Sequence, residues 1–210
     1  VADLVGREAV DERGGALGEV IETSTVRLWV ESDRLHDLPP LGSVVRVANG
    51  VGDTIYAVVS FGQTAGIDET RRAIRRGSDQ IRDDEVYRRH PELTQILRTT
   101  FEALPVAYRR GGAIRRMLPP LPPPLHYSVE AVEGDDLRDL TGDPRYLSLL
   151  VAADAAVPTD HLVAAHLRQV YEARGDDRPW LEMAAREIAR LLKNDYDRVL
   201  PLLEAIDPDG

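Results

Sequence analysis

The first third of the chain alternates apolar and polar residues with the period of a β-strand. In residues 26–32, VRLWVES, one face carries Val26, Leu28 and Val30, and the other face is mostly polar. A period of two predicts a half-buried strand because successive side chains point to opposite faces of a sheet. Segments rich in glycine, proline and aspartate separate such runs, which predicts a small barrel or sandwich. The runs are residues 17–25, 26–32, 43–49 and 54–62.

The pattern changes to a charged, helix-favouring one after residue 66. Gly77 and Pro91 interrupt this segment, so the sequence predicts two or three short helices within an insertion of about residues 66–100. Asp68 is a candidate N-cap for the first helix, and Pro91 is placed to open the last one. The strand pattern returns at residues 104–112.

A proline-rich stretch, LPPLPPPLHYSVEAV, covers residues 118–132. This stretch has three interpretations: a polyproline peptide displayed to a partner, a linker between domains, or a lead-in to a strand. An alternating strand, Tyr127–Val132, follows the prolines with no spacer, and another strand precedes them. Proline lacks the N–H that a sheet ladder needs, so we expect Pro119–Pro124 to form a stiff lead-in within one domain.

From residue 134 the pattern is helical. A short helix over 135–142 is followed by residues 143–154, which fit either a helix or a buried strand. Two longer helices are predicted, one capped by Thr159 and ending before Gly175, the next capped by Asp177. The predicted fold class is therefore α+β. It comprises a barrel domain over residues 1–150 with the helical insertion, and a helical C-terminal extension over 151–210.

Composition removes many kinds of chemistry. The chain has no cysteine, so disulfides, thiolate metal sites and cysteine nucleophiles are excluded. Its single lysine, Lys193, precedes Asn194, which excludes a phosphate-binding P-loop. His161 and His166 are five residues apart and face different sides of a helix, and no metalloprotease or serine-hydrolase motif occurs. We therefore predict a protein that is not an enzyme and has no catalytic, cofactor-binding or metal-ligating residue. With no apolar run long enough for a membrane span, we expect no membrane partner and a cytoplasmic location.

Charge is unevenly distributed along the chain. The formal net charge is −10, yet residues 71–120 hold 12 arginines and only 6 acids. One interpretation is a docking face for acidic protein or nucleic acid. The favoured one is that these arginines pair with the protein's own acids or with a second subunit. The candidate contact face is Arg71, Arg72, Arg75, Arg76, Arg109, Arg110, Arg115 and Arg116.

Three segments together resemble a known family. They are GEVIETSTVRLWVESD, LGSVVRVANGVGDTIYAVVSFG and PVAYRRGGAIRRMLPPLPPPLHYSVEAVEGDDLRDLTG. Their order and spacing resemble the HAS barrel, the N-terminal β-barrel of HerA-type DNA translocases and of ATP synthase head subunits. The likeness covers about residues 10–150. Leu125 and His126 depart from it, because they stand where the family pattern has glycine.

The resemblance implies a role in assembly. In the translocases this barrel contributes to ring formation and to docking of partners, within DNA processing, and a P-loop ATPase domain follows it. No such domain follows here, so ATPase activity is not implied. The leading hypothesis is a non-catalytic adaptor that contacts a partner protein or a second copy of itself, with no cofactor. The first alternative is a nucleic-acid-binding accessory factor that uses the arginine-rich middle segment, and the lesser alternative is an enzyme with an unrecognised site.

Overall fold

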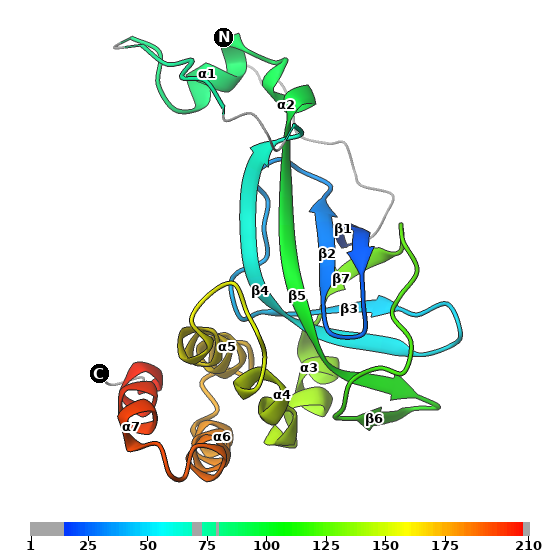
Figure 1. Ribbon diagram of the computed structural model, residues 1–210, viewed down its shortest axis with the longest axis vertical. Coiled ribbons are helices and arrows are strands. Elements are labelled where there is room, and N and C mark those ends of the chain that lie inside the picture. The colour runs from blue at the N-terminus through cyan, green and yellow to red at the C-terminus, as the bar shows by residue number, and fades with distance from the viewer. Residues whose placement is uncertain (1–14, 69–72, 79, 208–210) are drawn as a thin grey trace, which may run out of the picture.

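The alternating strands close into a barrel. A computed structural model describes residues 15–68, 73–78 and 80–207 (Figure 1). Six strands pair antiparallel in the order β2-β1-β7-β3-β4-β5, and pairing of β2 with β5 closes the ring. A further short strand, β6 (Ala113–Arg115), forms a hairpin on β5 outside the ring. The barrel strands are β1 (Ala16–Thr23), β2 (Leu28–Ser32), β3 (Val44–Ala48), β4 (Thr54–Gly66), β5 (Leu97–Arg110) and β7 (Ser128–Ala131).

Apolar side chains at alternate strand positions fill the inside of this barrel. Leu28 and Val30, predicted to share a face, are both fully buried there. Val26 was predicted on the same face but is 54% exposed, because it lies before β2 in a turn held by Ser24. The predicted small barrel is confirmed. Its interior is Val20, Leu28, Val30, Val45, Val47, Ile55, Ala57, Val59, Phe101, Ala103, Tyr108 and Val129.

Strands β4 and β5 extend beyond the end of the barrel. They stay paired from Thr54↔Arg109 to Gly66↔Leu97, whereas β2 leaves β5 at Glu31↔Thr100. The two strands therefore continue as a ribbon that projects from the barrel and carries two short helices, α1 (Asp84–Arg89) and α2 (Leu93–Ile96), at its far end (Figure 1). We call residues 63–68, 73–78 and 80–100 the arm.

The arm corrects the predicted helical insertion. Residues 73–77 are not helical, so the expected helix over the arginine run is wrong in its described part, and the rest of it lies outside the described residues. Residues 97–100 belong to β5, where β-branched Thr99 and Thr100 favour an extended backbone. Among the described residues of the insertion, helix is thus found only within residues 84–96.

A loop from the barrel contacts both the base of the arm and one of its helices. The backbone N–H of His36 donates to Oγ1 of Thr99 at 2.7 Å, and its Nε2 lies 2.7 Å from the hydroxyl of Tyr87 in α1. The same two rings meet edge to face at 5.1 Å. These contacts connect the arm to the barrel at a second point besides β4 and β5.

The remaining helices pack on the outer wall of the barrel. They share a core with wall residues Val44, Tyr56, Val58, Leu104 and Val106. The α+β fold with a barrel and C-terminal helices is confirmed. The elements are α3 (Gly134–Thr141), the 3-10 helix η1 (Pro144–Tyr146), α4 (Leu147–Val151), α5 (Thr159–Ala173), α6 (Arg178–Leu191) and α7 (Tyr196–Ile206).

The chain passes from strand to helix between Ala131 and Gly134. Leu147 and Leu150 of α4 lie in the same core cluster as Leu162 of α5, so packing is continuous across residue 150. The proline stretch lies against the barrel: Pro119 and Pro123 are buried. His126 then donates its N–H to the carbonyl of Val20 at 2.8 Å, which leads the chain into β7. This arrangement agrees with the predicted lead-in.

Candidate functional site

The predicted arginine face does not form a single surface. Arg71 and Arg72 lie outside the described residues, whereas Arg75 and Arg76 are exposed on the arm. The remaining four, Arg109, Arg110, Arg115 and Arg116, lie at the other end of β5 and in the β6 hairpin (Figure 1). Arg75 and Arg76 therefore lie near one end of β5, and the remaining four lie near the other end.

Most of the second group is engaged inside the fold. Arg110 donates to both oxygens of Asp53, at 2.7 and 2.6 Å, and these bonds hold the pKa of that carboxyl below its ordinary value. Arg116 donates to the main-chain oxygens of Asp139 and Leu140. Arg115 is exposed and forms no ion pair with any residue that the structure describes. Arg110 thus follows the interpretation that the arginines pair with the protein's own acids.

Arg109 belongs to a polar cluster that ties α3 to the barrel. Asp136 accepts hydrogen bonds from Arg109 at 2.6 Å, from Arg46 at 3.0 Å and from the Tyr56 hydroxyl at 2.7 Å. Burial raises the pKa of Asp136, but these three bonds outweigh it, and the pKa lies below its ordinary value. Arg46 also donates to Glu130 at 2.8 Å. The cluster is therefore internally paired, and its hydrogen bonds connect α3 to the barrel.

Two buried residues form a second polar contact. Nδ1 of His166 lies 2.7 Å from the carbonyl of Gly42, and its Nε2 lies 2.9 Å from the Tyr146 hydroxyl. Both rings are fully buried, and burial lowers the pKa of His166 to about 4. The imidazole is therefore neutral and joins the loop before β3 to α5.

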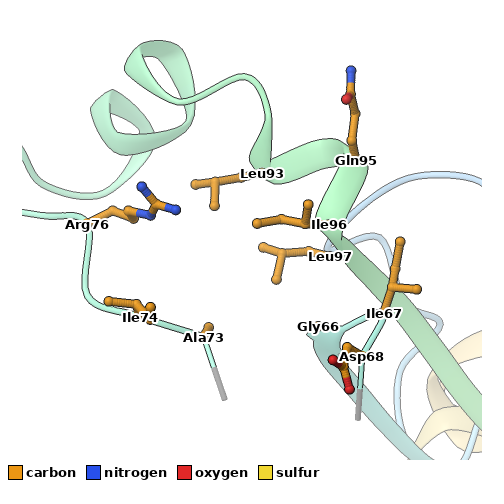
Figure 2. Close-up of a pocket in the computed structure, with 10 residues that line it drawn as sticks. All are labelled: Gly66, Ile67, Asp68, Ala73, Ile74, Arg76, Leu93, Gln95, Ile96 and Leu97. Atoms are coloured by element: carbon orange, nitrogen blue, oxygen red, sulfur yellow. The ribbon is translucent and has the colours of Figure 1, made fainter. Parts of the chain in front are cut away.

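The tip of the arm carries an open apolar groove of about 450 Å³. Leu93, Ile96 and Leu97 form one wall, and Ile74 and Arg76 lie on the facing segment. Figure 2 shows Ile96 and Leu97 directed across the gap toward them. Such a volume lies within the range of ligand-binding pockets.

The apolar residues around this groove are unusually exposed. Ile74 is 79% exposed, Ile67 54% and Ile96 47%. Large aliphatic side chains on a projecting element lose contact with water only when another molecule covers them. Sequence reasoning missed them: single isoleucines inside a charged run, as in RRAIRR, were the available signal.

The rim of the groove is charged. Arg76 lines it and Arg75 is exposed beside it, while Asp68 lines it and has an interaction of its own. Arg76 also interacts electrostatically with the carboxylate of Glu92. Both arginines are solvent-accessible, so the rim can receive carboxylates from another molecule.

Comparisons with known proteins add little. No family model matches the chain. A stretch of 23 residues is 96% identical to part of the ribosome maturation factor RimM of Rubrobacter xylanophilus. The matched stretch covers 11% of this chain and 14% of that relative's length.

Within the described residues, no group of three or more His, Asp or Glu side chains could hold a metal, and no helix is long and apolar enough to cross a membrane.

Proposed function

We propose that this chain is a non-catalytic assembly module that docks a protein segment in the groove at the arm tip. The observation that carries the proposal is the set of three exposed isoleucines around that groove, on an element that projects from the barrel. Interface anchors are typically apolar side chains that fill a pocket, surrounded by polar groups.

The rim defines the partner's chemistry. Arg75 and Arg76 favour a segment that presents apolar side chains flanked by carboxylates. The resemblance to the HAS barrel supports an assembly role, and with it a place in DNA processing. The short match to a ribosome maturation factor covers too little of either chain to transfer a role.

Nucleic-acid binding is the less supported function. It would need a continuous cationic face, and Arg109 and Arg110 are paired with Asp136 and Asp53. Enzymatic activity has weaker support still. The polar cluster around Asp136 lines an open depression, but Arg46, Arg109 and Tyr56 all donate to the Asp136 carboxylate.

Site-directed photocrosslinking tests the proposal. A photoreactive phenylalanine derivative replaces Ile74 in the full-length protein, and the control carries it at Val51, which is 64% exposed in the β3–β4 turn. Crosslinked peptides from cells are then sequenced by mass spectrometry. We expect adducts at position 74, absent at 51, whose peptides carry apolar residues next to aspartate or glutamate.

Two further variants test the charges on the rim. Arg76→Glu is expected to reduce the yield of these adducts, and Arg115→Glu, a change on the distant hairpin, is expected to leave it unchanged. Adducts to nucleic acid at position 74, or the same peptides at positions 74 and 51, would overturn the proposal.

A further inference from the structure

Helix α7 lies at the other end of the molecule from the arm (Figure 1). It carries two large apolar side chains that are exposed to solvent. Tyr196 is 72% exposed and Leu200 is 59% exposed. Their spacing of four residues places them one above the other on the same side of the helix. Together they form an uncovered apolar ridge about one turn long.

This ridge is not needed to hold the helix in place. Val199, Leu202 and Ile206 anchor α7 through a neighbouring, buried face, in the core that it shares with α5 and α6. The helix therefore keeps its position whether or not the outer face is covered.

Two carboxylates lie along one side of the ridge. Asp197 and Glu204 are exposed next to Tyr196 and Leu200. Neither acid forms an ion pair with another described residue, so both are available to a cationic partner. The face thus has the chemistry that the arm-tip groove requires, namely two apolar side chains with negative charge beside them.

From this complementarity we infer that the arm-tip groove of one copy receives the outer face of α7 of a second copy. Tyr196 and Leu200 enter the groove beside Ile74 and Ile96, and Asp197 and Glu204 approach Arg75 and Arg76. The two surfaces lie at opposite ends of one molecule, so the contact forms between molecules (Figure 1). This inference rests on the proposed function and names the docked segment.

The contact is heterologous, because the two surfaces that meet are different. Repeated head-to-tail contacts produce a closed ring if the rotation closes and a filament if it does not. One groove and one helical turn bury less area than a standard stable interface, so each contact is weak and self-association depends on concentration.

Complementation between two variants tests this arrangement. Ile74→Asp blocks the groove, and Leu200→Asp blocks the α7 face. Both side chains are exposed, so the fold is retained, which thermal melting verifies. Light scattering over about 1 to 500 µM covers the affinity range of a weak contact. We expect the wild type to grow beyond its 23.3 kDa monomer and each variant to bind itself at least about tenfold more weakly.

Mixing the two variants gives the decisive measurement. The first variant keeps its α7 face and the second keeps its groove, so an equimolar mixture should form a single contact and stop at a dimer of about 47 kDa, twice 23.3 kDa. A mixture that stays monomeric, or a single variant that assembles like the wild type, would overturn the inference. Val51→Asp is the matched control and should assemble normally.

Charge exchange gives an independent readout. Reversing Arg75 and Arg76 to glutamate, or Asp197 and Glu204 to arginine, should each weaken self-association, and the chain carrying both sets should regain it. No recovery would contradict the assigned ion pairs. A wild type that stays monomeric, while position 74 still crosslinks to an acidic segment of another protein, would refute self-docking and leave the proposed function standing.

Discussion

Replacement of Gly42 by alanine should destabilise this protein strongly, because the glycine touches the backbone of α5. Gly42 has φ +86°. A Cβ at this position would lie 2.4 Å from the backbone nitrogen of His166 and 2.6 Å from the carbonyl carbon of Ala165. Backbone atoms of a helix cannot rotate away as a side chain can, so the loop and the helix must separate.

Three effects contribute to the expected cost. A left-handed backbone conformation costs an alanine about 1 kcal/mol relative to glycine. Forcing a packed contact apart costs about 1 to 3 kcal/mol. Separation also weakens the buried hydrogen bond between the Gly42 carbonyl and His166, worth about 1 kcal/mol. We expect a loss of about 3 to 5 kcal/mol, a large share of the 5 to 15 kcal/mol typical of folded domains.

Urea unfolding of Gly42→Ala and Gly52→Ala separates these effects. Gly52 also has a positive φ, +96°, but an added Cβ there meets no atom within 4 Å. The control should therefore lose only the backbone contribution of about 1 kcal/mol, and the excess in Gly42→Ala measures the contact with α5. Equal losses in the two variants would refute the proposed close packing between this loop and the helix.

Three further predictions concern buried polar groups. Folding lowers the pKa of His166 from 6.5 to about 4. The contribution of the neutral imidazole to the free energy of unfolding is therefore fully present above pH 6.5. That contribution is lost as the pH falls toward 4, at a cost of about 3 kcal/mol, and His166→Gln should flatten the fall in urea titrations. Asp136→Ala leaves two arginines and a phenol without their shared acceptor and should cost about 2 to 4 kcal/mol. The same change at Asp139, which is 64% exposed, should cost less than about 0.5 kcal/mol in the same assay. Glu102→Gln removes a buried charge that accepts from Ser60 at 2.7 Å and faces Arg27 at 3.3 Å, and a loss of about 1 to 2 kcal/mol in thermal melting is expected.

Local signals in the sequence predicted most of the barrel and the C-terminal helices. Alternation is imposed by the pleat, so Leu28 and Val30 could be assigned to the interior without knowing their partners. The N-cap at Asp177 was also predicted, and its side chain accepts from the N–H of Trp180 at 3.1 Å. At α5 the predicted cap is wrong: Pro158 occupies the N-cap position, and Thr159 instead donates to the carbonyl of Ala153 at 3.4 Å.

The arm could not be predicted because its pairing is non-local. Residues 97–100 follow a charged segment whose composition favours helix, and only their register with Gln63–Gly66 makes them a strand. The arginines illustrate the same limit. Spacing in the sequence grouped Arg109 with Arg110, but strand pairing directs one to Asp136 and the other to Asp53. A charge run therefore indicates where cations are abundant, and the tertiary fold decides which remain exposed.

Stability and the proposed docking reside in different parts of the molecule. The barrel interior and the helical core bury their apolar side chains, whereas Ile74 on the arm and Leu200 on α7 remain largely in contact with water. An exposed side chain contributes little to the free energy of unfolding, so a charge placed at either position should leave the melting temperature nearly unchanged. Loss of association without loss of stability would then be attributable to the contact itself, whereas a substitution such as Gly42→Ala changes both.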